Sequence, residues 1–571
     1  MHRWLLFSVA AAPLLLLSFR AAPPGLVWWT THALEKVRPG DSPPSHPQKS
    51  VSISAARNEF EPFQIVFHAV SQNIDGVDVE IADLLGPKGA VIGRQNAAIY
   101  FEAALDLKTP STIQDRTGEW PDPLIPRIDR YYGERRNAFP FKLSDGRNQA
   151  IWIEIYVPPS APDGDYAGDV QVSFQGRRQF SIPVKLRVWN FTLPSTSSLP
   201  NSFGLNGISA LHQHLGKYTS DRDAFAFTHL YQKAALWHRI SAHGASMTPP
   251  PFTRHGDEVS IDWTRYDEEA GPFLDGKVFK DSEPLFGAKA TSVDLRTNNS
   301  AGTDDLKVLY WREFARHFRE KGWIDRLFFY VWDEPSAEET GDVLRKAKLA
   351  HEADRSIPNL VTASLNPRWA DAIDIWAPLI NCFEPRDGFP AYCRTLADRG
   401  EYETEIRKGK RLWWYQSCAS HGCNTVGGDY FSGWPSYMID ASPVANRIME
   451  WMSFKYGIQG ELYFNMTEGF RKKTQPWENV NLFGGNGDGT LFYPGLPGRI
   501  GGKSDIPVES IRLKLIREGL EDYEYLHLLN NELAAGTVNS LVRKTYDFEH
   551  DPVKLYAARQ KMGEALSSFL K

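Results

Sequence analysis

The stretch LFFYVWDEPSAEE, residues 327–339, decides the fold of the larger part of this chain. Its apolar and aromatic residues 327–332 predict a buried strand, which ends in two adjacent carboxylates, Asp333 and Glu334, and then in Pro335. A helical pattern follows at residues 337–353, and a second apolar run, NLVTASL, begins at residue 359. A strand, a helix and another strand in this order predict parallel strands joined by a crossover helix.

The same alternation continues on both sides of this stretch. Short apolar runs predict further strands at 202–207, 241–247, 372–381, 411–418 and 460–466, with amphipathic helices between them. This pattern predicts a (β/α)8 TIM-like catalytic barrel over residues 196–571, with LFFYVWDE as its fourth strand, rather than an open doubly wound sheet. We expect one closing helix over residues 510–536 and another near 552–570. No glycine-rich phosphate loop follows a predicted strand.

The N-terminal part has the periodicity of strands instead. QAIWIEIYVP, residues 149–158, and DVQVSFQGRRQFSIPVKLRVWNFTLP, residues 169–194, alternate apolar and polar residues, and turn-rich segments separate such runs. Several short strands of this kind predict a β-sandwich domain over residues 23–195. A polar, proline-containing linker, LPSTSSLPNS, marks its end at residues 193–202.

The first residues, MHRWLLFSVAAAPLLLLSFRAAPPG, have the pattern of a secretory signal peptide over residues 1–22. The alternative is an uncleaved anchor, but the apolar run is short for a membrane span and contains Pro13. We therefore expect an exported protein, periplasmic or extracellular, with no membrane span after signal cleavage.

The four cysteines fit export, because an even number in an exported protein suggests disulfides. Three connectivities are possible, and we favour the pairs that are local in sequence, Cys382–Cys393 and Cys418–Cys423. Zinc is the competing interpretation, but neither spacing is C-x2-C, so no metal is expected.

Composition excludes some functions and indicates one. The formal charge of -6 and the lack of a long basic run argue against a nucleic-acid binder. The aromatic content of 13%, with 18 Trp, is typical of sugar-stacking surfaces, although large aromatic cores have the same composition. The sequence leaves the oligomeric state open.

The pair Asp333–Glu334 is the main candidate for chemistry. In a barrel, the C-terminal ends of the strands carry the catalytic residues. Burial and a neighbouring negative charge both raise the pKa of a carboxylic acid, which suits a general acid that protonates a glycosidic oxygen. The alternative is an ordinary strand-to-helix turn, where acids and proline favour the first turn of a helix.

Two glycosidase mechanisms can use such a pair. A conventional retaining enzyme needs a second carboxylate as nucleophile, about 5 Å from the acid. The seventh predicted strand, RLWWYQSCASHG, contains no Asp or Glu, which leaves Glu384, Asp429 and Glu468 as candidates. In a substrate-assisted enzyme, the 2-acetamido group of the sugar is the nucleophile, and a carboxylate beside the acid orients it. The missing carboxylate of strand seven favours this second mechanism.

The motifs YVWDEP, LWWYQSCAS, YGIQGELYFN, GDGTLFYPG and SIRLKLIREGLEDYEYL, in this order, resemble the catalytic domain of glycoside hydrolase family 123. The segments SAARNEFEPFQIVF and VPPSAPDGDYAGDVQV are similar to the β-sandwich that accompanies it. The resemblance implies a substrate-assisted β-N-acetylgalactosaminidase, with Glu334 as acid/base and Asp333 orienting the acetamido group. Relatives often have Trp where this chain has Phe464, which bears on sugar specificity because Phe lacks an N–H donor.

Other residues near predicted strand ends are candidates for substrate binding. Tyr415 is expected to donate to the acetamido carbonyl oxygen, and His243 to bind a sugar hydroxyl. Since side chains alternate along a strand, only some of the aromatic residues in LWWYQ can face the barrel interior. The remaining candidates, each with a structural role as the alternative, are Trp413, Trp332, Phe464, Asn465 and Asn206. Asp488 is expected to be a turn residue.

The sequence thus predicts an exported, retaining, substrate-assisted glycoside hydrolase that releases terminal β-linked N-acetylgalactosamine from glycans or glycoconjugates without a metal or organic cofactor. Two alternatives stay open. One is a conventional glycosidase acting on a sugar without an acetamido group, and the other is a non-catalytic carbohydrate-binding protein.

Overall fold

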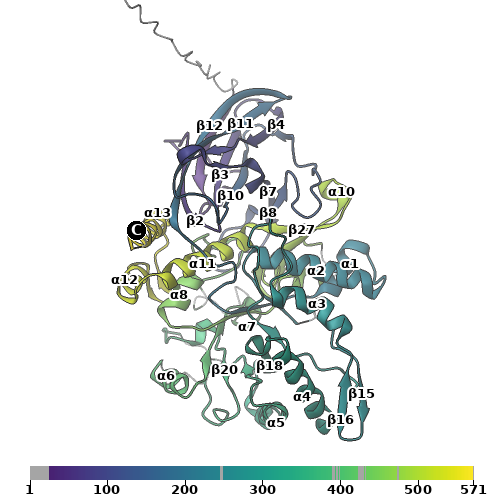
Figure 1. Cartoon of the computed structure of the whole chain (residues 1–571). Coiled ribbons are helices and arrows are strands. Elements are labelled where there is room, and N and C mark those ends of the chain that lie inside the picture. Colours follow the sequence, from purple (N-terminus) through teal and green to yellow (C-terminus); the bar gives the residue numbers. More distant parts are fainter. Residues whose placement is uncertain are drawn as a thin grey trace, which may run out of the picture.

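The structure is a computed structural model that describes residues 25–244, 248–388, 393, 397, 399–421, 430, 432–471 and 475–569. The predicted signal peptide, residues 1–22, lies outside the described residues. Figure 1 shows the β-sandwich at the top and a mixed helix-and-strand part below it. Among the residues described, no helix is both long and apolar enough to cross a bilayer.

Two sheets form the sandwich, in agreement with the alternating sequence pattern. The first has the strand order β1-β3-β10-β7-β8-β27-β26, and the second has the order β2-β12-β11-β4-β9 with β5 and β6 at its side. Neighbours are antiparallel except β2 and β12, which are parallel. Apolar residues of both inner faces pack into one core. The N-terminal strands are β1 (Leu26–His32), β2 (Val51–Arg57), β3 (Glu59–Ala69), β4 (Ile74–Ile81), β5 (Leu84–Leu85), β6 (Val91–Ile92), β7 (Ala97–Leu107), β8 (Gly118–Pro126), β9 (Phe141–Leu143), β10 (Asn148–Val157), β11 (Gly164–Phe174) and β12 (Arg177–Thr192).

The first sheet also recruits two strands from far along the chain. β26 (Phe492–Gly495) and β27 (Ile506–Ser510) form an antiparallel pair, and β27 continues the sheet by pairing with β8, where Glu509 lies opposite Leu124. Figure 1 shows β27 running beside β8 at the base of the sandwich. The sheet therefore crosses the boundary that the sequence pattern places at residues 195 and 196.

The second part has parallel strands and helices, as predicted, but its strands form two separate sheets. One has the order β14-β13-β23-β22 and the other β17-β18-β19-β20-β21, with every neighbouring pair parallel. Their bounds are β13 (Asn201–Gly204), β14 (Ala242–His243), β17 (Val293–Asp294), β18 (Leu327–Trp332), β19 (Asn359–Val361), β20 (Ile375–Trp376), β21 (Arg411–Leu412), β22 (Trp414–Tyr415) and β23 (Glu461–Tyr463).

The two parallel sheets approach each other at both ends. β21 and β22 belong to one predicted strand that is interrupted at Trp413. On the opposite side, the Gly244 N–H after β14 donates to Asp294 Oδ1 at the end of β17 (3.0 Å). No ladder joins β14 to β17 in the described part of the chain, so one continuous eight-stranded barrel stays a prediction.

Helices cover these sheets, and polar caps define several of their starts. The side chains of Ser220, Thr303, Ser510 and Asn530 each accept an N–H of the first turn. The main helices are α1 (Gly207–Leu215), α2 (Asp221–Trp237), α3 (Thr264–Asp275), α4 (Asp304–Glu320), α5 (Thr340–Ala353), α6 (Arg399–Arg407), α8 (Met449–Lys455), α11 (Ile511–Leu528), α12 (Asn531–Leu541) and α13 (Pro552–Phe569). Shorter elements are the hairpins β15 (Phe252–His255) with β16 (Glu258–Ile261), β24 (Asn481–Leu482) with β25 (Gly485–Asn486), and β28 (Val542–Lys544) with β29 (Asp547–Phe548), and the helices α7 (Cys418–His421), α9 (Glu468–Arg471) and α10 (Pro497–Ile500).

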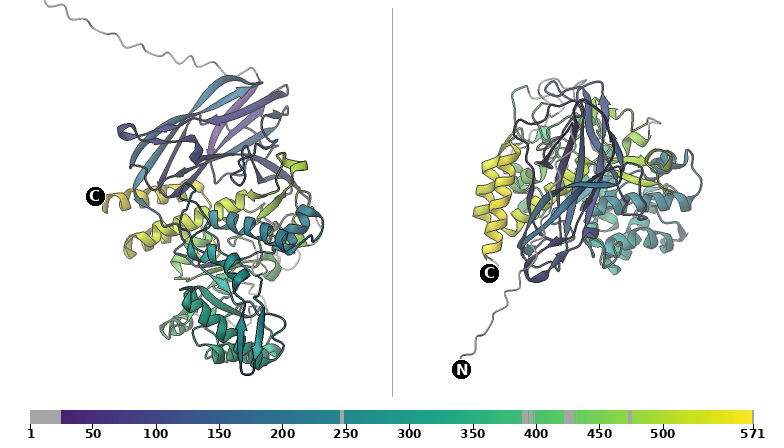
Figure 2. Two further views of the ribbon diagram at one scale, coloured as in Figure 1. Left: turned by 45° about the vertical axis from the view of Figure 1, so that its right-hand side comes forward. Right: turned by 90° about the horizontal axis from the view of Figure 1, so that it is seen from above.

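The single helix predicted over residues 510–536 is wrong. Leu529 takes an extended conformation, and Asn530 caps a new helix by accepting the Leu533 N–H (2.9 Å). The helix expected near 552–570 is confirmed as α13. Figure 2 shows the C-terminal helices, in yellow, below the sandwich and toward one side of the molecule.

A buried pair of glutamates makes the stability of this fold dependent on pH. Glu461 on β23 and Glu450 on α8 are both buried, and the Tyr437 hydroxyl donates to Glu461. Burial raises the pKa of Glu461 to about 7, although the Tyr437 hydrogen bond lowers it. Burial, followed by the charge of Glu461, raises the pKa of Glu450 well above its ordinary value.

We therefore expect the free energy of unfolding to fall as pH rises from about 4.5 to about 7, because the folded chain keeps a proton on Glu461 that the unfolded chain releases. Glu461→Gln mimics the protonated form, so it removes the contribution of Glu461 to this slope and stabilises the protein at pH 8 by roughly 1–3 kcal/mol. Urea unfolding between pH 5 and pH 8 measures the effect, with the exposed Glu478→Gln as the control. Parallel pH curves for wild type and Glu461→Gln would contradict this interpretation.

Candidate active site

The two carboxylates lie directly after β18, where the chain leaves the sheet. The pairing of β18 with β19 shifts register between Tyr330 and Trp332, and Glu334 has a left-handed backbone, with φ at 47°. A residue with a Cβ rarely adopts this conformation. The Glu334 N–H donates to Oγ1 of Thr362, the residue that follows β19 (2.8 Å).

Asp333 is held through one of its two oxygens. The Tyr330 hydroxyl donates to Asp333 Oδ1 (2.8 Å), and the Thr362 hydroxyl donates to the same oxygen (3.0 Å). Burial, followed by the charge of Asp333, raises the pKa of Tyr330 well above its ordinary value, so this phenol stays protonated. Asp333 Oδ2 has no hydrogen bond within the described part of the structure.

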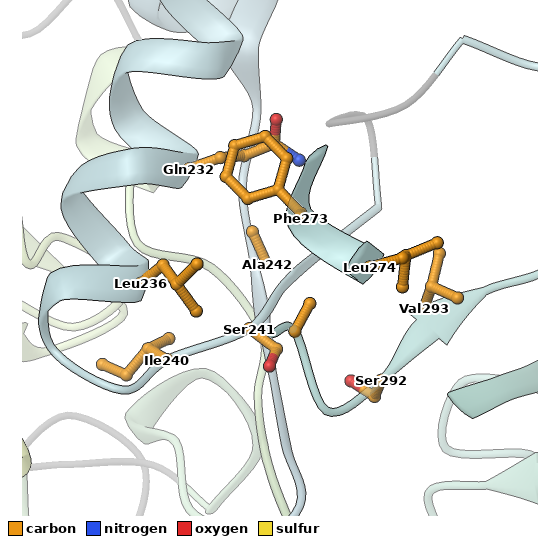
Figure 3. Close-up of a pocket in the computed structure, with 10 residues that line it drawn as sticks. Gln232, Leu236, Ile240, Ser241, Ala242, Phe273, Leu274, Ser292 and Val293 are labelled. Carbon is orange, nitrogen blue, oxygen red and sulfur yellow. The ribbon is translucent and has the colours of Figure 1, made fainter. Parts of the chain in front are cut away.

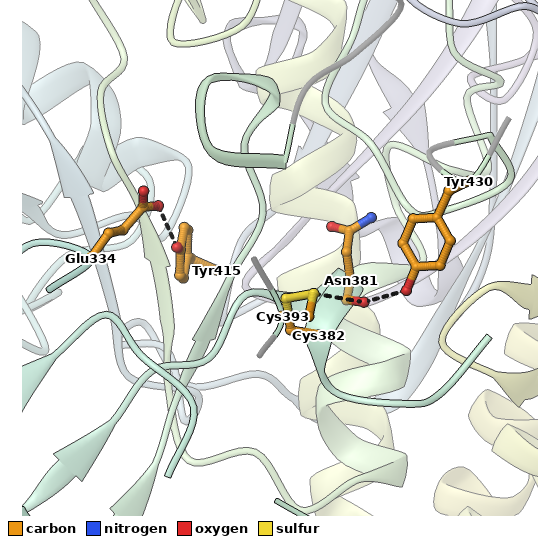
Figure 4. The surroundings of a disulfide bond; sticks show 6 residues. All are labelled: Glu334, Asn381, Cys382, Cys393, Tyr415 and Tyr430. Carbon is orange, nitrogen blue, oxygen red and sulfur yellow. Dashed lines mark hydrogen bonds between the residues drawn. A yellow bond between two sulfur atoms is a disulfide. The ribbon is translucent and has the colours of Figure 1, made fainter. Parts of the chain in front are cut away.

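Glu334 is held in a similar way by Tyr415, which ends β22 on the opposite sheet. The Tyr415 hydroxyl donates to Glu334 Oε1 (2.5 Å), and Figure 4 shows the two side chains facing each other. Tyr415 is 5% exposed, and burial, followed by the charge of Glu334, raises its pKa well above the ordinary value. The structure thus brings Tyr415 to the pair, but with Glu334 as its partner. A contact with an acetamido carbonyl stays a prediction.

Both carboxylate side chains are exposed, unlike the buried acid that the strand pattern suggests. The sequence pattern suggested two causes that favour a protonated acid, burial and a neighbouring negative charge. The described residues alone do not supply the burial. The negative neighbour is present, since the two residues are adjacent in sequence.

Neighbouring strand ends add His243 and two residues that sequence analysis missed. His243 ends β14 and is 7% exposed, and burial lowers its pKa although Asp294 and Asp333 oppose the shift. Asp294 ends β17, accepts the Gly244 N–H and pairs with Arg296 (3.5 Å). A neutral imidazole beside an ion pair forms a polar wall on this side of the site.

The aromatic residues of strand seven divide between two faces. Trp413 and Tyr415 pack with Phe328 and Leu360 in one apolar cluster, while Trp414 faces the helices and donates to Ser453 Oγ (3.0 Å). Trp413 is only 2% exposed. Trp413 therefore packs against the cluster that holds Tyr415. Its side chain has almost no exposed surface with which a substrate could make the predicted contact.

Three other predicted binding residues make their described contacts with residues outside the pair. Lys346 of α5 stacks on the Trp332 ring (3.9 Å to its centroid), so Trp332 faces the helix layer. Asn206 caps α1 by accepting the Ser209 N–H (2.9 Å). Asn465 donates to Glu468 (2.8 Å) and accepts the Thr467 N–H (2.9 Å), which makes it a loop-stabilising residue.

Phe464 and Asp488 meet at one loop. Phe464 is partly buried and packs edge-on against Tyr463 and Phe483 (centroids 5.3 and 6.2 Å apart). A Cβ at Gly489 would lie 2.5 Å from the Phe464 ring, so only a glycine at this position leaves room for the ring. Asp488 is fully buried and accepts a hydrogen bond from Tyr463 (3.2 Å), consistent with a structural role.

Two of the three alternative nucleophiles, Glu384 and Glu468, already make contacts within the protein. The third, Asp429, lies outside the described residues. Glu384 accepts hydrogen bonds from the Tyr456 hydroxyl and the Thr545 N–H (both 2.7 Å). Glu468 pairs with Arg471 (3.0 Å). Within the described ranges, no group of three or more His, Cys, Asp or Glu side chains can hold a metal ion.

A separate cavity lies between α2, α3 and the beginnings of β14 and β17, lined mainly by apolar side chains. Figure 3 shows Leu236, Phe273 and Leu274 around it, with Ser241 and Ser292 near its floor. None of the predicted site residues lines this cavity, so we attach no chemistry to it.

The predicted disulfide Cys382–Cys393 is confirmed, with the two Cα atoms 5.1 Å apart. Cys418 is also disulfide-bonded, while its predicted partner Cys423 lies outside the described residues. Cys382 and Cys393 belong to the same apolar cluster as Tyr415, and Figure 4 shows the bridge close to that tyrosine.

Comparison with known proteins finds one family model that matches the part of the chain carrying this site. Residues 292–529 match the family model "Glycoside hydrolase 123, catalytic domain". No protein with a curated description matches the chain. The fold is similar to that of a family 123 glycoside hydrolase from Clostridium perfringens, studied for glycolipid glycan hydrolysis, with a TM-score of 0.64 and 15% identity over 95% of this chain and 98% of that chain.

Two other solved glycoside hydrolases show weaker likeness. A family 39 enzyme from Bacteroides cellulosilyticus WH2 has a TM-score of 0.30 and 8% identity, covering 83% of this chain and 82% of that chain. A GH5 xyloglucanase from Bacteroides ovatus has a TM-score of 0.29 and 10% identity, covering 83% of this chain and 98% of that chain. Scores this low do not establish a common fold.

We expect the double variant Cys382→Ser/Cys393→Ser to lower the free energy of unfolding by about 3 kcal/mol, because the bridge closes a short loop in the unfolded chain. Guanidinium unfolding under non-reducing conditions measures this change, since the Cys418 bridge then stays intact in both proteins. An unchanged unfolding midpoint would show that the bridge does not stabilise the cluster around Tyr415.

Proposed function

We propose that this chain, which carries a glycoside hydrolase 123 catalytic domain over residues 292–529, is a retaining, substrate-assisted hydrolase of terminal β-linked N-acetylgalactosamine. Its substrates are glycans or glycoconjugates. The glycolipid glycan hydrolysis studied for the similar Clostridium perfringens enzyme makes glycolipid oligosaccharides the first natural substrates to test. The N-terminal sequence pattern supports export to the periplasm or the extracellular space.

The observation that carries this proposal is the division of the two carboxylates between different hydroxyl partners. Asp333 Oδ1 accepts from Tyr330 and Thr362, and Glu334 Oε1 accepts from Tyr415. One oxygen of each carboxylate is thus held by the protein. The other oxygen of each is free to meet a substrate, so two adjacent residues can perform two different tasks.

In the first step, Glu334 donates a proton to the glycosidic oxygen as the bond from that oxygen to the anomeric carbon breaks. The acetamido carbonyl oxygen of the same sugar attacks the anomeric carbon from the other face and forms an oxazolinium ion. The acetamido nitrogen becomes positive in this step. Asp333 accepts its N–H and stabilises that charge electrostatically.

In the second step, Glu334 acts as a base. It takes a proton from a water molecule that attacks the anomeric carbon and opens the oxazolinium ring. Two displacements on opposite faces retain the β configuration. No further carboxylate nucleophile is needed, which agrees with the engagement of Glu384 and Glu468 in structural contacts.

A panel of four aryl glycosides tests the substrate class. We expect hydrolysis of the β-N-acetylgalactosaminide, less or none of the β-N-acetylglucosaminide, and none of the β-galactoside and β-glucoside, because the last two lack the nucleophilic acetamido group. Release of the aryl alcohol measures each rate. Turnover of the β-galactoside, with trapping of a 2-fluoro sugar on a protein carboxylate such as Asp294, would instead establish a conventional retaining glycosidase. Sugar binding without any turnover would indicate a binding protein.

The two carboxylates are distinguished by the leaving group. Glu334→Gln should lower kcat/KM on a poor leaving group by about 10²–10⁴-fold but change kcat/KM little on a dinitrophenyl glycoside, which leaves without protonation. On the dinitrophenyl glycoside kcat should still fall, because the second step has lost its base. Asp333→Asn should lower kcat by about 10²–10³-fold on both, because it fails to balance the acetamido charge. The exposed Glu338→Gln, from the same segment, is the control. Near-normal turnover by Asp333→Asn would rule out the substrate-assisted mechanism.

A further inference from the structure

We propose that Thr362 is a positioning residue whose single hydroxyl sets the orientation of both carboxylates at once. Thr362 lies just beyond β19 and is 3% exposed, so a substrate is not expected to reach it. The proposal rests on the function proposed above for the tasks of Asp333 and Glu334. The geometry that supports it is independent of the sugar that the enzyme cleaves.

Three polar atoms converge on Thr362 Oγ1. They are the Glu334 backbone nitrogen (2.8 Å), Asp333 Oδ1 (3.0 Å) and the Tyr330 hydroxyl (3.2 Å). A threonine hydroxyl has one proton to donate and two lone pairs that accept. The backbone N–H can only donate, and the Asp333 carboxylate accepts. The Thr362 proton is therefore directed to Asp333, and its lone pair receives the Glu334 N–H.

Tyr330 completes the arrangement from β18 itself. Its one proton lies within reach of Asp333 Oδ1 (2.8 Å) and, at a longer distance, of Thr362. The shorter contact goes to the carboxylate. Asp333 Oδ1 thus receives two donors from neighbouring strands, which restrain the carboxylate and leave Oδ2 without a hydrogen bond among the described residues.

The contact with the Glu334 N–H has a different consequence. The left-handed backbone of Glu334 is unfavourable for a residue with a side chain, and neighbouring contacts must hold it. Thr362 supplies the side-chain acceptor for the N–H of this residue. This conformation turns the Glu334 side chain toward Tyr415 on the opposite sheet, while the preceding Asp333 stays on Tyr330.

The same contacts explain why two adjacent residues point their carboxylates to different partners. Successive side chains of a regular strand alternate between faces, so neighbours do not share a site. The register shift at Tyr330 and Trp332, followed by the turn at Glu334, breaks this alternation. Thr362 stabilises this irregular backbone by two hydrogen bonds, one to the side chain of Asp333 and one from the backbone N–H of Glu334.

The test compares Thr362→Val, which keeps the shape and removes the hydroxyl, with Thr362→Ser, which keeps the hydroxyl. We expect Thr362→Val to lower kcat by about 10–100-fold with KM within about threefold, because misplaced groups mainly weaken the transition state. The acidic limb of its pH–rate profile should move to higher pH, since the Asp333 anion loses a donor. Thr362→Ser should stay within about threefold of wild type in kcat.

Two further measurements keep the proposal falsifiable. Thermal melting checks that each variant is folded, and if Thr362→Val does not fold, Tyr330→Phe tests the Asp333 arm through the same shift of the acidic limb. Crystal structures of wild type and Thr362→Val give a readout that needs no turnover. We expect the Asp333 carboxylate to rotate and the Glu334 φ angle to change in the variant.

A wild-type kcat and pH profile in Thr362→Val, equal losses in Thr362→Val and Thr362→Ser, or an unmoved pair in the variant crystal structure would each overturn the proposal. Failure of the proposed function is distinguishable, because it appears in the wild-type enzyme as the wrong sugar preference. The Thr362 variants are then assayed on whichever aryl glycoside the wild type cleaves. If it cleaves none, the crystal structures decide.

Discussion

The arrangement of the molecule depends on a buried carboxylate, Glu154 of β10, that is surrounded by cations from two parts of the chain. Arg130 (2.6 Å) comes from the sandwich side, and Lys514 (3.0 Å) and Arg517 (2.9 Å) come from α11. Burial alone would raise the pKa of Glu154, but these three cations hold it well below its ordinary value. Removing one partner from such a network leaves an unpaired buried charge, at a cost of about 3–5 kcal/mol. The sandwich is therefore held to the α/β part, and its first sheet accepts β27 directly before α11 begins.

This attachment explains why the active-site strands can be so short. β14, β20, β21 and β22 contain two residues each, too few to define a rigid sheet alone. Contacts between neighbouring strands also fix the strand ends of this layer, such as Gly244 to Asp294 and Glu334 to Thr362. The catalytic geometry is thus carried by hydroxyl and carboxylate contacts at the strand ends, and the sandwich and α11 stabilise the layer around them.

Local pattern was enough to predict many of the elements, because these have a strong signal within a few residues. The apolar run before Asp333 is β18, the alternating runs are sandwich strands, and the short spacing of Cys382 and Cys393 indicated their bridge. The roles of Thr362, Tyr330 and Asp294 were missed because they depend on which strand ends meet, and on a register shift that has no local signature. Thr362 directly follows Leu360 and Val361 within NLVTASL, residues 359–365, so a polar residue after a buried strand was the available signal. The pairing of β27 with β8 and the break at Trp413 likewise follow from tertiary contacts.

The exposure of Asp333 and Glu334 has a mechanistic consequence. Water at an open carboxylate pair weakens the electrostatic interactions that a general acid and a charge-stabilising anion require. A sugar ring seated over the pair would exclude that water and place the acetamido group against Oδ2 of Asp333. Under the proposed substrate-assisted mechanism, the substrate then supplies both the nucleophile and the dry surroundings in which the two carboxylates differ most. A sugar without the acetamido group would leave Asp333 facing solvent with no positive charge to balance, so the proposal derives discrimination and rate enhancement from the same contact.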